Sequence, residues 1–498
     1  MSKERLESVT GVQLMQGIGH APAQGFWADA WGTVLKRKDA VVGLCWILVV
    51  GFFAIFSPLV ASGHPLMLRQ LDEAGNITAT TFPLFSYLAP IDLLLPAGLG
   101  LALPIAWFVG ARARRAARVK ATIAAVFIAL AIVIISGLLQ ASMGSRSPLP
   151  GLAWAKASLS PGWLLAMGVA VIVGLIAAAL PLAEKPGRRA RIVLSGVLLG
   201  SMCTIAAWDR PSIEKFDYTR REQAKEISAT FTVVPFSPSQ RFSELSRLAP
   251  GTTLGEGLKL DAAAPGAGRT FHLGTDAFGS DVLSQMMHAC RLSISIGLVS
   301  TSIALVIGVT LGALMGYFGG IVDLVLYRIV EIFMAVPVLF LLIVAAAVLP
   351  PELRTTYMMM AIIGAFSWTG MARFTRAEFM KLRNQDFVQA AKAAGLPLRS
   401  VLFKHMLPNG VAPVLVDTSF AIASAITIEA VLSYLNLGPI DQASWGKLLA
   451  SAVSSEGEFK WWLAVFPGVA IFFTVLSYNI IGEALRDAID PKLKKARV

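Results

Sequence analysis

The sequence contains few charged residues for its length. Lysine, arginine, aspartate and glutamate together make up 15% of the 498 residues, whereas 55% are hydrophobic and the mean hydropathy is +0.67. A water-soluble fold of this length could not cover so much apolar surface with so few polar side chains. We therefore expect an integral membrane protein.

Residue types that perform chemistry are scarce or scattered. The three cysteines, Cys45, Cys203 and Cys290, lie in or beside apolar segments without metal-ligand spacing, so we interpret them as small core residues. The five histidines are dispersed, and the chain has no phosphate-binding G-x-x-x-x-G-K-[ST] motif. The sequence therefore predicts no enzyme active site, no metal, no cofactor and no ATP hydrolysis by this chain.

Positive charge is in excess, with a formal net charge of +12. Nucleic-acid binding is one interpretation of such a charge. However, much of the lysine and arginine lies in short clusters beside apolar runs, where positive charge fixes the orientation of a membrane protein. We expect a lipid bilayer, and no nucleic acid, as the partner of these residues.

Long apolar runs predict about ten transmembrane helices, whereas the strands of a barrel would appear as short alternating segments. With an even number of spans, the basic clusters after the second and fourth spans and in the C-terminal tail all lie in the cytoplasm. Both termini are then cytoplasmic, and no cleaved signal peptide is expected. The predicted spans are residues 41–61, 91–110, 122–140, 163–183, 191–208, 293–318, 329–349, 357–373, 412–434 and 461–482.

Composition divides the chain into four parts. Residues 1–61 contain an interfacial helix and the first span. A flexible polar tail is the alternative to that helix. The helix is favoured by the helical spacing of Phe26, Trp27, Trp31, Val34 and Leu35. Residues 62–208 have the composition of an inserted four-span block, and residues 209–290 of a polar extracytoplasmic segment. Residues 291–498 contain five further spans.

A long predicted cytoplasmic loop, residues 374–411, has internal order. Gly395 is suited to a left-handed helix end and Pro397 prevents continuation, and a second short helix is predicted from Arg399 to Met406, ending before Pro408. Such a knob is suited to docking in a groove on a partner, and a helix resting on the membrane is the alternative that periodicity leaves open. One small, apolar helical face is predicted from Phe387, Ala390, Ala391 and Ala394.

The string QAAKAAGLPLRSVLFKHMLP in this loop resembles the EAA loop of ABC-importer permeases. Gln389 replaces the usual glutamate, which keeps the shape and a hydrogen-bonding side chain but loses a charge. The resemblance implies that the loop is the coupling helix that binds an ATPase subunit. The coupling residues that it implies are Asp386, Phe387, Gln389, Ala390, Ala391, Ala394, Gly395, Leu407 and Pro408.

Further segments resemble the C-subunit type of oligopeptide and dipeptide permeases. These are LGTDAFGSDVLSQMMHACRLSISIGL, GGIVDLVLYRIVEIFMAVP, EAVLSYLNLG, SWGKLL and NIIGEALRDAIDP. The likeness covers residues 25–61 and 271–491, with Ser280 in place of the family's arginine and Glu331 in place of its second aspartate. The residues to which it assigns structural or gating roles are Gly274, Thr275, Asp276, Gly279, Asp281, Arg291, Asp323, Arg328, Glu331, Pro337 and Glu429.

The resemblance implies an all-α, type I ABC-importer permease fold in a bacterial inner (plasma) membrane. The apolar runs place four of the about ten transmembrane helices in an N-terminal insertion, for which that family offers no counterpart. The resemblance also implies import of peptides or a related small solute, driven by ATP hydrolysis on partner chains. The expected partners are a second permease subunit, two ABC ATPase subunits and an extracytoplasmic solute-binding protein. The alternatives are an ion-coupled secondary transporter and a non-transporting membrane scaffold. The former would be expected to repeat a broken helix or buried ionisable pairs in its two halves, and we see no such repeat.

The acidic residues near the spans have two interpretations. Glu331 and Glu429 either line the path or serve structure, with Glu331 paired to Arg328 and Glu429 accepting a hydrogen bond; we favour structure. Similarly, Asp276, Asp281 and Arg291 either contact the receptor or clamp the extracytoplasmic segment to the helix bundle. We favour the clamp.

Overall fold

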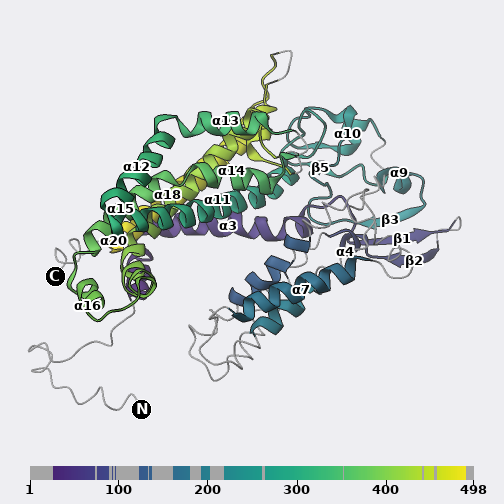
Figure 1. Cartoon of the computed structure of the whole chain (residues 1–498). Coiled ribbons are helices and arrows are strands. Elements are labelled where there is room, and N and C mark those ends of the chain that lie inside the picture. Colours follow the sequence, from purple (N-terminus) through teal and green to yellow (C-terminus); the bar gives the residue numbers. More distant parts are fainter. Residues whose placement is uncertain are drawn as a thin grey trace, which may run out of the picture. The chain divides into compact units, whose positions relative to one another are not determined.

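The computed structural model of this chain is mostly helical (Figure 1). The residues that it describes are 26–72, 76–88, 92, 96, 123–132, 134–136, 161–179, 192–201, 218–260, 264–350, 353–439, 442–453 and 457–489. The chain divides into two compact units. The first unit comprises Met1–Val49, Ser293–Asp441 and Gly468–Val498, and the second comprises Val50–Leu292 and Gln442–Pro467.

Four helices of the described residues are long and apolar enough to cross a membrane, or five if one bent pair counts as a span. They coincide with four of the predicted spans, because an apolar run of about 20 residues must satisfy its backbone as a helix in lipid. They are α3 (Lys38–Val60), α11 (Val282–Phe318), α18 (Leu407–Tyr434) and α20 (Trp461–Ile489).

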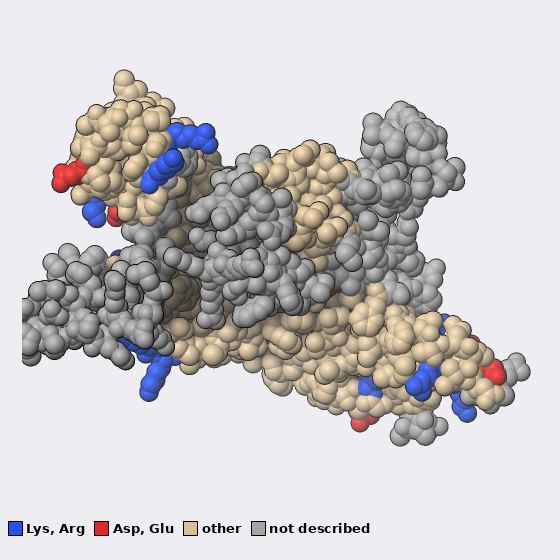
Figure 2. Space-filling model, turned by 90° about the horizontal axis from the view of Figure 1, so that it is seen from below, with Lys and Arg blue, Asp and Glu red and all other residues tan. Residues whose placement is uncertain are grey.

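The surfaces of these helices are apolar. Val42 on α3, Val306 on α11 and Phe472 on α20 are each at least 60% exposed. Figure 2 shows one face of the molecule, on which the acidic and basic side chains are few and wide areas of the described surface carry none. Such a surface is suited to contact with lipid chains, which offer no partner for a charge.

Two predicted spans are interrupted. In place of the span at 329–349, α12 (Gly320–Ala335) and α13 (Val338–Val348) meet at an angle of 78° around Pro337. In place of the span at 357–373, α14 (Thr356–Phe366) ends at Ser367 and α15 (Thr369–Leu382) begins two residues later. Neither predicted span is one continuous helix, because hydropathy registers the apolar run and not the change in backbone direction.

Helices α11, α12 and α15 pack side by side in the first unit (Figure 1). Ala304 and Met315 of α11, Val330 of α12 and Ala372 of α15 belong to one buried cluster. Because α15 extends to Leu382, it occupies the first residues of the predicted loop at 374–411.

The N-terminal helix α2 (Phe26–Val34) is present, as the aromatic spacing predicts. Its Ala30 and Val34 are buried in a cluster that includes Ala484 of α20. Val34 therefore does not belong to an exposed face, although Trp31 and Leu35 are exposed.

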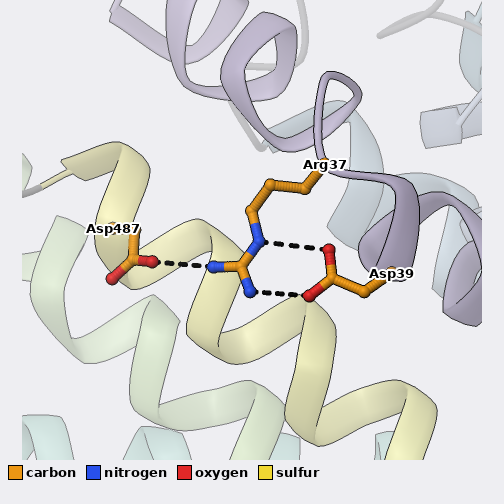
Figure 3. Close-up of polar contacts among 3 residues, drawn as sticks. All are labelled: Arg37, Asp39 and Asp487. Carbon is orange, nitrogen blue, oxygen red and sulfur yellow. Dashed lines mark hydrogen bonds and ion pairs between the residues drawn. The ribbon is translucent and has the colours of Figure 1, made fainter.

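Arg37 links the start of α3 to the end of α20 (Figure 3). One guanidinium nitrogen donates to Asp487 at 2.7 Å, and the other two donate to Asp39 at 2.7 and 3.2 Å. The hydrogen bond to Asp39 is the main reason that the pKa of Arg37 is raised above its ordinary value. The pairs are partly exposed, so we expect them to fix geometry more than to stabilise the fold.

The second unit contains short strands that the sequence analysis did not predict. Strands β1 (Met67–Leu71), β2 (Ile77–Thr81) and β3 (Ile227–Thr230) form an antiparallel sheet in the order β2-β1-β3. Arg69 on the central strand pairs with Thr80 on one side and Ser228 on the other. The sheet therefore joins residues before the predicted helices of the insertion to residues after them.

The rest of this unit is built from short elements around an aromatic core. Phe236 and Phe271 are buried and stack at 4.3 Å between ring centroids. The remaining elements are α4 (Pro83–Tyr87), α9 (Tyr218–Gln223), η3 (Ser243–Leu245), β4 (Thr252–Thr253), α10 (Leu254–Leu258), β5 (Thr270–Phe271) and α19 (Trp445–Ala450).

The insertion is described in part, through α7 (Pro161–Ala179), the helix Ile192–Ser201 and helical residues 123–132. A Cβ on Gly196 would lie 2.7 Å from the carbonyl oxygen of Ala125. The helix Ile192–Ser201 and the helical residues 123–132 therefore touch at their backbones. Most of the predicted span at 91–110, the basic loops after the second and fourth predicted spans, Cys203 and the basic tail lie outside the described residues.

Candidate functional site

The candidate site is the segment between α15 and α18. Helix α16 (Asp386–Ala393) follows α15 after a short turn, and Gly395 has a φ of +70°. The amide of Gly395 donates to the carbonyl of Lys392 at 2.9 Å, and the amide of Leu396 donates to that of Ala391 at 3.2 Å. A left-handed residue with these bonds is a common helix ending, and glycine adopts it without a Cβ penalty. The predicted glycine turn is thus present.

The end of the segment differs from the prediction. Helix α17 (Leu398–Ser400) is followed by a π-helical turn (Val401–Met406), which continues directly into α18. Pro408 lies in the first turn of α18, inside helical backbone that runs on from the π-helical turn. The predicted helix end before Pro408 was therefore wrong, and Leu407 and Pro408 belong to the start of a long helix.

The inner side of α16 packs on its own chain. Val388 and Ala391 are buried with Phe379 of α15 and with Val401 and Met406. Of the small, apolar face that was predicted, Ala391 is not open to a partner, because only 6% of this residue is accessible and it packs with Phe379 of α15. Periodicity identified a small side of the helix but not which part of it the same chain covers.

Polar contacts hold α16 in place. The Gln389 amide nitrogen donates to the backbone carbonyl of Arg383 at 2.8 Å, which closes the turn from α15. The Lys392 ammonium lies 4.9 Å from the centre of the Tyr317 ring on α11, a cation–π distance. A charge at position 389 is not needed for the bond that Gln389 makes.

The outer side of the segment is exposed and apolar. We call Phe387, Ala390, Ala394, Leu396 and Leu398 the outer face; Phe387 is 39% and Leu398 42% exposed, and Asp386 is exposed beside them. Exposed apolar residues outside the membrane spans mark an interaction surface. Sequence reasoning missed the two leucines, although their position on either side of Pro397 prevents one helix from burying both.

The motif at 274–281 lies in the second unit and forms a tightly packed turn. Gly274 and Gly279 have φ values of +78° and +74°. A Cβ on Gly274 would lie 2.5 Å from the Leu248 carbonyl oxygen, and one on Gly279 would collide with the Phe242 carbonyl. Glycine is required at both positions because the chain segment at 242–248 passes directly over them.

Hydrogen bonds of Thr275 and Asp276 hold this turn in place. The Thr275 hydroxyl donates to the Leu245 carbonyl at 2.5 Å and accepts from the Leu248 amide at 2.8 Å. The Asp276 carboxylate accepts from the amide of Ser280 at 2.9 Å and from the side chain of Gln285 at 2.6 Å. These bonds tie the segment at 242–248 and the motif at 274–281 to the start of α11.

Asp281 caps α11. Its carboxylate accepts from the Ser284 amide at 2.7 Å, as an N-cap residue does. Burial raises the pKa of Asp281 to about 7, and the neighbouring Asp276 adds to the rise. The buried carboxyl is thus held partly protonated near neutral pH.

Arg291 joins three segments of the second unit. Its Nε donates to the Ala54 carbonyl of α3 at 2.9 Å, and its guanidinium forms a largely buried ion pair with Asp92. Asp92 lies at the start of the second predicted span. Receptor contact by Asp276, Asp281 or Arg291 stays a prediction, and the bonds that these residues make in the structure are all within the chain.

The remaining motif residues lie in the first unit. Arg328 and Glu331 form the predicted ion pair on one helix at 2.6 Å, and both are exposed. Glu429 on α18 is buried and accepts from the Ser433 hydroxyl at 2.6 Å. Pro337 stands at the bend between α12 and α13. Their gating roles stay predictions.

Asp323 forms a contact that the sequence analysis missed. Its carboxylate binds the guanidinium of Arg376 through two nitrogens, at 2.5 and 2.7 Å. No local signal identifies this pair, because α12 and α15 are separated by two other helices in the sequence. Within the described residues, no group of three or more histidine, cysteine, aspartate or glutamate side chains could hold a metal ion.

Two protein-family models match the chain. The binding-protein-dependent transport system inner membrane component matches residues 308–495. The N-terminal TM domain of oligopeptide transport permease C matches residues 25–90, which include α2, α3, β1 and β2.

Curated relatives are similar to part of this chain. The di/tripeptide transport system permease protein DppC of Pseudomonas aeruginosa is 37% identical over 265 residues, 53% of this chain and 82% of that protein. The oligopeptide transport system permease protein OppC of Bacillus subtilis is 39% identical over 223 residues, 45% of this chain and 72% of that protein. Among solved structures, the inward-facing MetNI methionine ABC transporter is 18% identical over 42% of this chain and 97% of that chain, with a TM-score of 0.33.

Proposed function

Because this chain belongs to the oligopeptide and dipeptide branch of the binding-protein-dependent transport permeases, we propose that it is a permease subunit through which an ATP-driven importer moves peptides or related small solutes. The proposed partners are a second permease subunit, two ABC ATPase subunits and an extracytoplasmic solute-binding protein. The proposed location is the bacterial inner membrane, with both termini in the cytoplasm.

The observation that supports ATP coupling is the outer face of the segment between α15 and α18. This face is apolar and exposed, while the inner side of α16 packs against α15 through Val388 and Ala391. A partner that binds the outer face can therefore displace α15 rather than only the loop. An ATP-driven step needs such a contact, because the partner must favour one state of the helices over the other.

The insertion is proposed to begin after residue 90. The matched family region ends there, and β1 and β2 lie inside it. Strand β3 then pairs with β1 from the far side of the insertion, so the sheet closes the chain around the added helices. These bounds replace the start at residue 62 that composition suggested.

A pair of glycine variants tests the coupling proposal. Gly395 and Gly457 both have a positive φ, of +70° and +81°, and a Cβ at either would meet nothing within 4 Å. Aspartate therefore causes similar backbone strain at both positions, but only Gly395→Asp places a charge beside the outer face. Gly457→Asp, in the other unit, is the matched control.

The assay uses the complex purified from native membranes through a tag on this chain. We expect Gly395→Asp to insert normally but to lose the copurifying ATPase subunits or their stimulation by solute, while Gly457→Asp retains both. Full coupling by Gly395→Asp would contradict the proposal. Solute movement by this chain in vesicles without any nucleotide would instead favour an ion-coupled transporter.

A further inference from the structure

Helices α11 and α15 touch at their backbones along three turns. Gly308, Gly312 and Gly316 of α11 are spaced by four residues and so lie on one face of the helix. A Cβ on Gly312 would lie 2.5 Å from the carbonyl oxygen of Ala372, and one on Gly316 would lie 2.6 Å from that of Arg376. The same distance at Gly308, to the Trp368 carbonyl, is 2.9 Å. Real Cβ atoms do not approach backbone so closely, so the contact excludes every larger residue.

The opposite attachment of α15 is the ion pair with α12. Arg376 binds Asp323 in the bidentate geometry that gives arginine–carboxylate pairs their directional strength. The pair is partly buried, with 26% of the arginine side chain and 15% of the aspartate side chain exposed. The guanidinium also lies 4.6 Å from the centre of the Tyr327 ring of α12. Arg376 therefore contacts α12 with its side chain and α11 with its backbone.

Helix α15 continues into the proposed docking segment. Phe379, one turn after Arg376, is fully buried against Val388 and Ala391 of α16. The Gln389 bond to the Arg383 carbonyl spans the turn between the two helices. A displacement of α16 thus meets no flexible linker before it reaches Arg376.

We infer that Arg376 is the positioning residue that makes α16, α15, α11 and α12 move as one lever during the transport cycle. This inference rests on the proposed function, since it names how movement leaves the docking segment. A bidentate pair holds two helices in one relative orientation, whereas apolar contacts alone permit sliding. Without the Arg376 side chain, α16 and α15 can still move on nucleotide binding, but α12 need not follow.

The test measures distances between spin labels in the complex, purified with its ATPase subunits and placed in lipid nanodiscs. The native cysteines are replaced, and labels are attached at Ala393 of α16 and Ile321 of α12, both exposed. A second label pair joins Ala393 to Phe472 of α20. Each pair is measured without nucleotide and after trapping with ATP and vanadate.

The lever predicts that the Ala393–Ile321 distance is unchanged and narrowly distributed in both states, while the Ala393–Phe472 distance shifts on trapping. In Arg376→Gln, the Ala393–Ile321 distribution should broaden or shift on trapping. The matched control is Arg328→Gln, which removes an exposed ion pair within α12 itself and should behave as the wild type. The reciprocal exchange Asp323→Arg with Arg376→Asp should restore the narrow distribution, which a merely structural loss would not do.

The outcomes separate the two proposals. No shift of the Ala393–Phe472 distance in the wild type means that ATP does not move the segment, which overturns the proposed function. A shift there combined with a variable Ala393–Ile321 distance in the wild type overturns the lever alone. A narrow, constant Ala393–Ile321 distance in Arg376→Gln overturns the role of Arg376.

Discussion

The backbone contact between α11 and α15 makes Gly312→Ala a sharp test of how this fold is held together. The added Cβ would meet the Ala372 carbonyl at 2.5 Å, whereas ordinary contact begins at 3.4 Å. The helices would have to separate by about 0.9 Å, the difference between those distances, or the backbone would have to bend. Separation moves Arg376 relative to Asp323 and weakens a pair whose two bonds are 2.5 and 2.7 Å long.

Two opposing effects set the magnitude. Alanine in a helix interior is more favourable than glycine by about 0.5–1 kcal/mol. Overpacking in a close-packed interior costs typically about 1–3 kcal/mol. We therefore expect a net loss of roughly 1–2 kcal/mol in Gly312→Ala, because the clashing atom is backbone and cannot rotate away.

Gly370→Ala is the matched control, since Gly370 lies in α15 and a Cβ there meets nothing within 4 Å. It should gain the helix propensity without the clash and be as stable as the wild type or more so. Both variants can be compared in detergent by the temperature at which the monodisperse size-exclusion peak is lost. Equal stability of Gly312→Ala and Gly370→Ala would refute the close contact.

Two further predictions concern the turn at 274–281 and the outer face. Burial raises the pKa of Asp281 from 3.8 to about 7, so the folded protein binds the carboxyl proton more tightly than the unfolded chain does. The free energy of unfolding should therefore fall as pH rises from about 4 to about 7, at up to about 1.4 kcal/mol per pH unit. Asp281→Asn keeps a capping oxygen and should flatten this part of a melting-temperature profile against pH; an unchanged slope would contradict the assignment. Phe387→Ala should weaken binding of the ATPase subunits about tenfold or more, as loss of an aromatic anchor does, and quantitative copurification measures it. Phe374→Ala, which truncates an exposed aromatic residue of α15, is its control, and equal binding by both variants would remove Phe387 from the interface.

Local patterns predicted the parts of the site that depend on nearby residues. The turn at Gly395 follows from a glycine and a proline two residues apart, and the Arg328–Glu331 pair follows from helical spacing. The break at Pro337 was missed although the proline is visible, because the apolar run on both sides satisfied the rule for one continuous span. Pro408 was misread in the opposite sense, as a stop rather than as part of a first turn.

The sequence by itself determined that this chain is a helical membrane protein, which family it resembles and where the proposed docking segment lies, because hydropathy, turn residues and short motifs act over a few neighbouring positions. Only the tertiary structure decided that Ala391 points inward, that Arg376 binds Asp323 and that β1 pairs with β3 across the insertion. Those facts depend on which distant segments meet and in what register. A local sequence pattern does not fix them, because the same pattern is compatible with several such pairings.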